Sequence, residues 1–353
     1  MGLMPKLGIM EIFFGSPWPK DARLSYAKFL KEAGYEIYLY GPKADPFLRR
    51  RWREEWPAEY RAELSAMSAT FRSHGIQFGV CFSPMGYHEE DPARAAALLA
   101  EKIKILNEIG IDELGLFFDD MPVHDALAAT QLEIVKKVRM EYGGKILFCP
   151  SFYSPDPILD KVFGARPPNY LEDLAEGLPS DIEIAWTGPK VISPEIGAAH
   201  LSEVAAQLRR PPSLCDNFFA NDGPKNCKFL KLKLLSGRGA DSFAASSAWY
   251  FNPMNQAELS KPLLLAAAKT LREGAGPEAA YEEALRDLCS PVLAKILIEE
   301  RGVFLDQGLD KISAEDQARL RAQLRPLLAE PMAAELLSFL DGAYTVGSEC
   351  LTD

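Results

Sequence analysis

Short apolar stretches alternate along the first 275 residues with longer stretches in which apolar residues recur at helical spacing. Eight short stretches predict strands: Leu7–Phe14, Glu36–Tyr40, Gln77–Phe82, Glu113–Phe118, Lys145–Phe148, Glu183–Trp186, Ser213–Asp216 and Ser242–Ser246. The amphipathic stretches between and after them predict helices over residues 20–33, 57–74, 91–108, 124–139, 167–177, 194–208, 225–235 and 256–272. In two of these, Asp91-Pro92 and Ser193-Pro194, a capping side chain precedes a proline, so we expect a helix to begin at each.

Strict alternation of buried strands and helices predicts a parallel sheet that helices cover. Eight such units in about 265 residues match the count and length of an α/β protein of the (β/α)8 TIM-barrel type. The alternative is a doubly wound open sheet, which usually carries a glycine-rich phosphate turn after its first strand. The turn here reads Gly15-Ser16-Pro17-Trp18, and the chain contains no GxGxxG. The sequence therefore favours the barrel.

The pattern changes after about residue 275, where no convincing strand is found. Helical spacing of apolar residues covers Glu282–Glu300 and Ala314–Leu328, and Pro331–Phe339 adds a shorter segment. We expect a catalytic barrel over residues 1–274 and a small helical domain over residues 275–353.

Charge and composition narrow the class of partner. The 353 residues include 39 Lys and Arg against 50 Asp and Glu, a net charge of −11, and 48% are hydrophobic. That content is too apolar for a disordered chain, no apolar run approaches the roughly 18 residues of a membrane span, and nucleic-acid binding needs a basic surface. We expect neither nucleic acid nor membrane as a partner. Arg49–Arg53 and the lysines at 225, 228, 231 and 233 are expected on solvated faces, or else the arginines are paired with Glu54 and Glu55.

Cysteine and histidine usage points to a reducing compartment without a metal site. The six cysteines are scattered with no CxxC pair, which is typical of reduced thiols, and the apolar stretch near the N-terminus is too short for a signal peptide. A cytoplasmic location is the resulting expectation. The four histidines show no zinc-ligand spacing and are expected to be surface or packing residues.

Candidate chemistry lies where the predicted strands end, because barrel active sites form at the carboxyl ends of the strands. The sharpest motif is Leu116-Phe-Phe-Asp119-Asp120, in which an apolar strand delivers two adjacent carboxylates. Repulsion between them should raise the pKa of one, as glycoside hydrolysis requires of its general acid. The alternative is that Asp119 caps the next turn and Asp120 is solvated.

Three further strand ends carry polar candidates. Cys215-Asp216-Asn217, with Asn221 and Asp222 close behind, offers amides and carboxylates for binding hydroxyls, although it also reads as a turn rich in Asp and Asn. Lys43 is able to neutralise a carboxylate or bind a sugar hydroxyl, or else is simply exposed. Tyr153 offers a phenol, or else is a core tyrosine.

In their order along the chain, several motifs resemble the β-N-acetylglucosaminidases of glycoside hydrolase family 84, the O-GlcNAcase and bacterial "hyaluronidase" group. The resemblance covers roughly residues 7–290. The matching segments are Gly8-Ile-Met-Glu11, Phe14-Gly15-Ser-Pro17-Trp18, Tyr38-Leu-Tyr-Gly-Pro-Lys43-Ala-Asp45-Pro46, Leu116-Phe-Phe-Asp119-Asp120, Phe148-Cys149-Pro150 with Tyr153, Trp186-Thr-Gly-Pro-Lys190-Val191, Asp216-Asn217, Ala220-Asn221-Asp222 and Asn252-Pro253-Met254-Asn255.

The resemblance implies a retaining exo-glycosidase whose nucleophile is the substrate's own 2-acetamido oxygen, which forms an oxazoline. Asp119 would orient the acetamido N–H, and Asp120 would be the general acid and then the general base. Tyr153 and Asn217 would hold the acetamido group. The remaining roles implied are ring-hydroxyl binding by Lys43, Asp222 and Asn252, and the floor of the acetyl-methyl pocket for Cys149. No metal or organic cofactor is implied, and the partner is a glycan or glycoconjugate containing N-acetylglucosamine.

Two departures from the family pattern touch substrate recognition. Ile12 stands where the family has a glycine that lets the backbone approach the sugar. Cys215 stands where the family usually has a tryptophan, so the acetyl pocket should be wider. Two alternatives stay open for this reason. The same barrel and acid pair would act on a different 2-acetamido sugar, or the chain would be an inactive sugar-binding homologue. The sequence leaves the oligomeric state undetermined.

Overall fold

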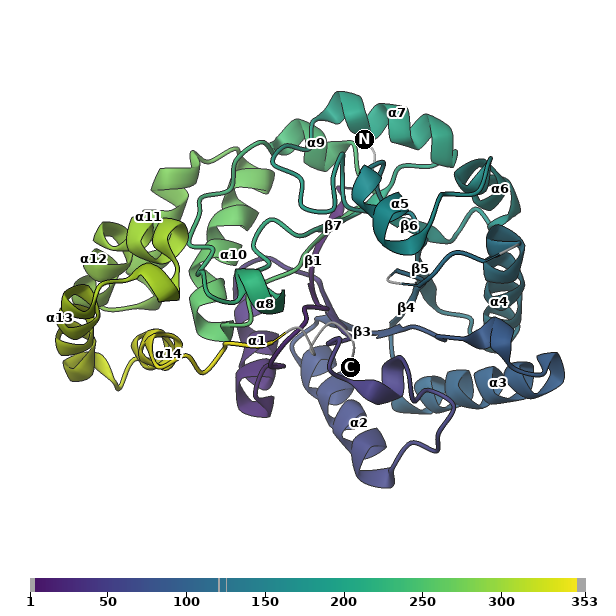
Figure 1. Cartoon of the computed structure of the whole chain (residues 1–353), viewed down its shortest axis with the longest axis horizontal. Coiled ribbons are helices and arrows are strands. Elements are labelled where there is room, and N and C mark those ends of the chain that lie inside the picture. The colour runs from purple at the N-terminus through teal and green to yellow at the C-terminus, as the bar shows by residue number, and fades with distance from the viewer. Residues whose placement is uncertain (1–3, 120, 125, 348–353) are drawn as a thin grey trace.

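The computed structural model describes residues 4–119, 121–124 and 126–347. Eight parallel strands close into a barrel in chain order, with the first strand paired to the eighth, and helices surround it (Figure 1). The strands are β1 (Lys6–Glu11), β2 (Ile37–Tyr40), β3 (Gln77–Phe82), β4 (Glu113–Phe117), β5 (Lys145–Cys149), β6 (Glu183–Trp186), β7 (Ser213–Asp216) and β8 (Ala248–Phe251). The predicted (β/α)8 barrel is confirmed.

The barrel closes because small residues make room for large ones inside it. Gly8 of β1 lies beside the Tyr250 ring of β8, and a Cβ at Gly8 would come within 2.7 Å of that ring. Gly79 of β3 is equally confined, since a Cβ there would lie 2.6 Å from the Glu113 carbonyl oxygen. Glycine at these two positions therefore leaves room for the large side chains and the backbone beside them.

The helices that surround the barrel begin largely where the sequence predicts. They are α1 (Lys20–Glu32), α2 (Ala58–Ser73), α3 (Pro92–Ile109), α4 (Leu127–Glu141), α6 (Tyr170–Gly177), α7 (Ala198–Leu208) and α10 (Ala257–Glu273), with shorter α5 (Pro157–Phe163), α8 (Gly223–Asn226) and α9 (Ala240–Ala244). The Asp91 side chain caps α3 by accepting from the backbone N–H groups of Ala93 and Arg94 at 3.1 and 3.0 Å. That predicted helix start is confirmed.

The strand predicted at Ser242–Ser246 is wrong. Helix α9 occupies most of this segment, and the eighth strand follows it at Ala248–Phe251. The Ser242 hydroxyl accepts from the Gly239 N–H, and the Ser246 hydroxyl donates to the Phe243 carbonyl. Such local side-chain bonds favour a helical turn, whereas the aromatic residues that follow suit a buried strand.

Two predicted helices also differ from the structure. The one expected over 225–235 is reduced to α8, because Leu230 and Leu232 are buried alternately with the less buried Lys231 and Lys233, as in extended chain. The helix expected from Ser193 begins instead at Ala198. The Ser193 hydroxyl is engaged elsewhere, donating to the Thr187 carbonyl at 2.9 Å.

The C-terminal helices lie on one side of the barrel (Figure 1). They are α11 (Pro277–Leu288), α12 (Pro291–Glu299), α13 (Ala314–Leu324) and α14 (Pro331–Leu340). The single helix expected over Glu282–Glu300 is wrong, because Ser290 caps a new helix in which Pro291 is the first residue. The division into domains at residue 275 stays a prediction. Among the described helices, none has the length and apolar content to cross a membrane.

Candidate active site

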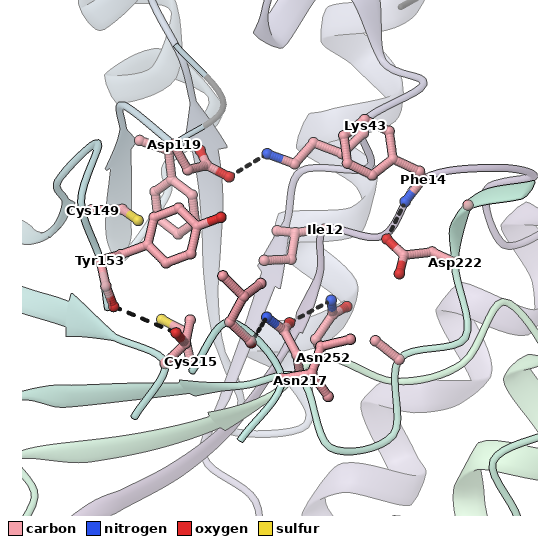
Figure 2. Close-up of a pocket in the computed structure, with 16 residues that line it drawn as sticks. Ile12, Phe14, Lys43, Asp119, Cys149, Tyr153, Cys215, Asn217, Asp222 and Asn252 are labelled. Carbon is pink, nitrogen blue, oxygen red and sulfur yellow. Dashed lines mark hydrogen bonds and ion pairs between the residues drawn. The ribbon is translucent and has the colours of Figure 1, made fainter. Parts of the chain in front are cut away.

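A cavity of about 220 Å³ opens at the carboxyl ends of the strands. It is lined by all the predicted site residues that the structure describes, namely Lys43, Asp119, Cys149, Tyr153, Cys215, Asn217, Asp222 and Asn252 (Figure 2). Asp120, the predicted general acid, lies outside the described residues. Segments far apart in sequence therefore meet at the rim where barrel chemistry is expected.

Asp119 and Lys43 form an ion pair across the rim of this cavity. The Lys43 ammonium donates to Asp119 Oδ2, and the two side chains are 6% and 11% exposed. Lys43 follows β2 and Asp119 follows β4, so the pair joins two different strand ends. Lys43 is buried beside a carboxylate, and the alternative of an exposed lysine is wrong.

Hydrogen bonds to Arg49 and Phe13 hold the backbone at Lys43. Arg49 is buried and donates to the Lys43 carbonyl at 3.2 Å, and the Lys43 N–H donates to the Phe13 carbonyl at 3.3 Å. The Arg49 guanidinium also lies 5.6 Å from the centre of the Phe14 ring. The expectation that Arg49–Arg53 is a solvated run is wrong for Arg49, although Arg51 does pair with Glu54.

Two asparagines join the seventh and eighth strand ends. The Asn252 side-chain amide donates to Asn217 Oδ1, and the Asn217 amide donates to the Val191 carbonyl, both at 2.9 Å. Asn252 Oδ1 is buried and has no hydrogen-bond partner among the described residues. Because an unpaired buried acceptor is costly, this oxygen is a candidate for accepting from a ligand hydroxyl.

Asp222 connects the loops after β7 and β1. Its Oδ2 accepts from the Phe14 N–H at 2.9 Å. The start of the β1 loop is held by Glu11, a fully buried carboxylate that accepts two hydrogen bonds from Arg23 at 2.7 and 2.6 Å. This Glu11–Arg23 pair was not predicted, and its signal in the sequence is only that a charged residue ends a buried strand.

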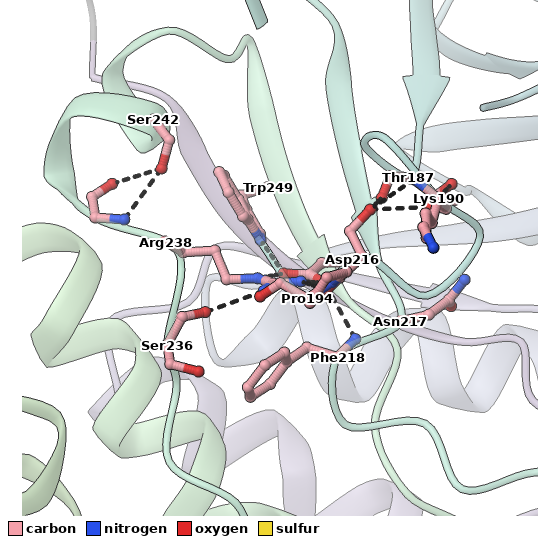
Figure 3. A network of polar contacts seen from close by, with 12 residues as sticks. Thr187, Lys190, Pro194, Asp216, Asn217, Phe218, Ser236, Arg238, Ser242 and Trp249 are labelled. Carbon is pink, nitrogen blue, oxygen red and sulfur yellow. Dashed lines mark hydrogen bonds and ion pairs between the residues drawn. The ribbon is translucent and has the colours of Figure 1, made fainter. Parts of the chain in front are cut away.

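Asp216, in contrast, faces away from the cavity. It ends β7 between two residues that line the cavity, Cys215 and Asn217, and successive residues of a strand face opposite ways. Arg238 binds its carboxylate through Nε and Nη2 at 2.8 and 2.9 Å, and both side chains are fully buried (Figure 3). Trp249 Nε1 and the Phe218 N–H also donate to it.

Arg238 also binds three backbone carbonyls, which belong to Ser193, Pro194 and Ser236. One guanidinium thus fixes the loop after β6, the end of β7 and the segment before α9 (Figure 3). Sequence reasoning missed Arg238. The alternation along β7 was the available sign that Asp216 needs a partner outside the cavity.

The floor of the cavity contains sulfur. Cys149 and Cys215 line it together with Tyr153, and Cys81 is buried nearby. Burial raises the pKa of the Cys215 thiol well above its usual value, and Asp119 adds to this by electrostatic repulsion of the thiolate. The thiol is therefore neutral at physiological pH, and this part of the floor is apolar.

The remaining walls are mostly apolar. Ile12 does line the cavity, as its place in the motif suggests. Further lining residues that were not predicted as site residues are Phe14, Phe117, Thr187, Val191, Ile192, Ala220 and Gly223. A small polar cluster on an apolar, partly enclosed wall suits a ligand of monosaccharide size with a few directed hydrogen bonds.

Residues 7–299 match the family model described as beta-N-acetylglucosaminidase. The chain belongs to this family of glycoside hydrolases. The match runs from the second residue of β1 to the end of α12 and therefore includes every lining residue of the cavity. Membership in glycoside hydrolase family 84, suggested by the motifs, is confirmed.

Relatives of this family member include Protein O-GlcNAcase of Rattus norvegicus and of Mus musculus, each 30% identical in an alignment of 234 positions that covers 63% of this chain. The chain spans 25% of the length of these curated relatives. A mutant of the O-GlcNAc hydrolase of Thermobaculum terrenum is similar in structure, with a TM-score of 0.74, 27% identity and coverage of 92% of this chain and 77% of that one. CpGH84B shares the fold, with a TM-score of 0.77, 20% identity and coverage of 97% and 66%.

A metal site would need several side chains that could bind the ion together. No group of three or more His, Cys, Asp or Glu side chains suited to a metal ion is found in residues 4–119, 121–124 and 126–347. The expectation that the reaction uses no metal or organic cofactor stays a prediction.

Proposed function

We propose that this protein is a retaining exo-glycosidase that removes terminal β-linked N-acetylglucosamine from a glycan or glycoconjugate by substrate-assisted catalysis. The observation that carries the proposal is the single cavity in which Asp119 meets Lys43, Tyr153, Asn217 and Asn252. Family membership over residues 7–299 supports the same reaction class.

In this proposal the acetamido oxygen of the substrate attacks its own anomeric carbon and forms an oxazoline. Asp119 accepts a hydrogen bond from the acetamido N–H and so turns the oxygen toward that carbon. The ammonium of Lys43 stabilises the negative charge of Asp119. A carboxylate has lone pairs for several donors, so the acetamido N–H is accommodated beside Lys43.

Asp120 protonates the leaving oxygen and then removes a proton from the water that opens the oxazoline. Tyr153 donates its hydroxyl to the acetamido oxygen and so fixes it for attack, and Asn217 holds the same group from the other side. As this oxygen gives electron density to the anomeric carbon, positive charge develops at the acetamido nitrogen, and the Asp119 carboxylate stabilises that charge. Stabilisation that grows as charge develops accelerates the reaction more than tight binding of the ground state does.

Binding of the sugar ring is proposed for Lys43, Asp222 and Asn252. The buried and unpaired Oδ1 of Asn252 favours a donor hydroxyl at that point. Cys149 and Cys215 would receive the acetyl methyl, since their neighbourhood is apolar. The cytoplasm is the proposed location, and the described cysteines, none of which forms a disulfide, agree with a reducing compartment.

The test is hydrolysis of aryl N-acetyl-β-glucosaminides by the wild type and by Asp120→Asn, with NMR to follow the anomeric configuration. We expect turnover with retention, inhibition by a thiazoline mimic of the oxazoline, and in Asp120→Asn a loss of about 10²- to 10⁴-fold in kcat/KM that is largest for poor leaving groups. Asp173→Asn, an exposed carboxylate on α6, is the matched control and should retain full activity.

Two results would favour the alternatives. Preference for the galacto isomer or for another N-acylated sugar would assign a different 2-acetamido substrate, which is the alternative that Ile12 and Cys215 suggest. Measurable sugar binding without turnover by the wild type would identify an inactive sugar-binding homologue.

A further inference from the structure

A second cavity, of about 320 Å³, opens on the same side of the barrel as the first. Its walls come from the loops after β3 and β4 and from the first turns of α4, and include Met85, Phe118, Val123, Leu127 and Ile134. Among the described residues, the loop after β3 contributes nothing to the first cavity, whereas every other strand end does. This loop instead builds the second cavity.

The second cavity is lined mostly by apolar side chains, with Arg50, Arg53, Glu89 and Thr130 among its polar lining residues, and it contains a buried hydroxyl without a partner among the described residues. Tyr87 lines it, is only 6% exposed, and its hydroxyl has no hydrogen-bond partner among the described residues. His88 and His124 stack at the cavity with ring centres 4.0 Å apart and planes at 18°. Partial burial, followed by the neighbouring His124, lowers the pKa of His88, so its ring is neutral and presents a flat face at physiological pH.

The two cavities lie on either side of one short segment of chain. Phe118 lines the second cavity, Asp119 lines the first, and Met121 lines the second again. Residue 120 connects them in sequence. In the proposed reaction Asp120 protonates the leaving oxygen, so the departing part of the substrate must pass beside this segment.

We propose that the second cavity is an aglycone site, which receives an apolar or aromatic group of the part of the substrate that leaves. This inference rests on the proposed function. Phe118, Leu127 and the His88–His124 stack contact the flat or apolar group, and the Tyr87 hydroxyl donates to an acceptor oxygen on it. The apolar side chains and the flat imidazole stack favour such a group over a second sugar, because each of the many hydroxyls of a sugar would need a polar partner.

The test compares two substrates with the same sugar, 4-methylumbelliferyl and methyl N-acetyl-β-glucosaminide. Val123→Trp narrows the second cavity and should lower kcat/KM for the umbelliferyl substrate about tenfold, while the methyl substrate changes less than about twofold. Val292→Trp, an exposed valine on α12, is the matched control and should change neither. Equal losses on both substrates, or no loss on either, would overturn the proposal.

Tyr87→Phe tests the hydroxyl separately. We expect it to lower kcat/KM for the umbelliferyl substrate about threefold with no loss of thermal stability, since the hydroxyl has no internal bond to lose. A loss by Val123→Trp that appears with N,N′-diacetylchitobiose but not with the umbelliferyl substrate would overturn the apolar assignment in favour of a sugar site.

A direct binding measurement separates failure of this site from failure of the proposed function. If the wild type hydrolyses none of the substrates, the proposed function fails, and free 4-methylumbelliferone becomes the probe. Saturation by the probe in the wild type and at least about fivefold weaker binding to Val123→Trp would support the cavity as an apolar site. Equal binding to both proteins would overturn it.

Discussion

Asp119 and Asp216 stand at the same rim of one barrel, yet they occupy opposite environments. Asp216 is fully buried and receives hydrogen bonds from Arg238, Trp249 and Phe218. Asp119 lines a cavity and is paired with Lys43 from another strand end. Position at a strand end is therefore not enough to mark a catalytic carboxylate. The side of the strand on which the residue lies decides whether its carboxylate is buried against an arginine or faces the cavity.

The largest effect on stability is expected at the structural pair. Arg238→Met leaves the buried Asp216 carboxylate without its cation and should lower the free energy of unfolding by about 3–5 kcal/mol. Urea denaturation measures this. Arg238→Lys keeps the charge but not the bidentate geometry, so its loss should be smaller. A free energy of unfolding unchanged in Arg238→Met would show that the pair does not hold β7 in place.

The opposite pattern is expected at Asp119. Asp119→Asn should lower kcat/KM by about 10²- to 10³-fold, because an amide lacks the negative charge that the proposed mechanism uses to orient the acetamido group. Its loss of folding stability should be smaller than that of Arg238→Met, since the site is partly open. Parallel measurement of kinetics and denaturation checks both. A variant that unfolds easily but keeps its turnover would place Asp119 in the same class as Asp216.

Glu335 is a third carboxylate to compare with Asp119 and Asp216. Backbone N–H groups, rather than a cation, donate to it. Glu335 of α14 accepts from the Leu259 N–H at 2.7 Å at the start of α10, and burial raises its pKa to about 7. In the unfolded chain the pKa of this carboxyl group is near 4.5, so the folded state binds the proton more tightly. Stability contributed by the protonated group is complete below about pH 4.5 and is lost as the pH rises through about 7.

Glu335→Gln removes that titration. The stability of the variant relative to wild type should be more favourable at pH 8 than at pH 5, by of the order of 1–2 kcal/mol. Chemical denaturation of both proteins at the two pH values gives this double difference. A difference that is independent of pH, or of opposite sign, would contradict the raised pKa.

The smallest effect is expected at the surface. Arg51 binds Glu54 through two hydrogen bonds at 2.7 and 2.6 Å, so its geometry resembles that of Arg238 with Asp216. Both groups are exposed, however, and water competes for them. Arg51→Met should leave both stability and turnover unchanged within error. A measurable loss would show that geometry, rather than burial, separates the two arginines.

Much of the barrel follows from sequence because its signal is local. Seven of the eight strands lie where the apolar runs predict, and the parallel arrangement brings Lys43, Asp119, Asn217 and Asn252 together without any knowledge of distances. The eighth strand was misplaced because the hydroxyls of Ser242 and Ser246 form hydrogen bonds with backbone groups of Gly239 and Phe243, and these local bonds favour a helical turn.

The support of the site did not follow from sequence, because it depends on partners that are distant along the chain. Arg23 reaches Glu11, Arg49 reaches the Lys43 carbonyl, and Arg238 reaches Asp216. No local pattern distinguishes these buried arginines from exposed ones such as Arg51. Only the fold determines which guanidinium lies near a carboxylate or a carbonyl that water does not reach.

The thiols at the base of the first cavity have a consequence for oxidative damage. Oxidants and alkylating reagents attack the thiolate rather than the thiol. Burial raises the pKa of both Cys81 and Cys215 well above the usual value, so thiolate is scarce at neutral pH. These two thiols therefore resist sulfenic acid formation, and their reaction with a reagent such as iodoacetamide reports on opening of the barrel rim.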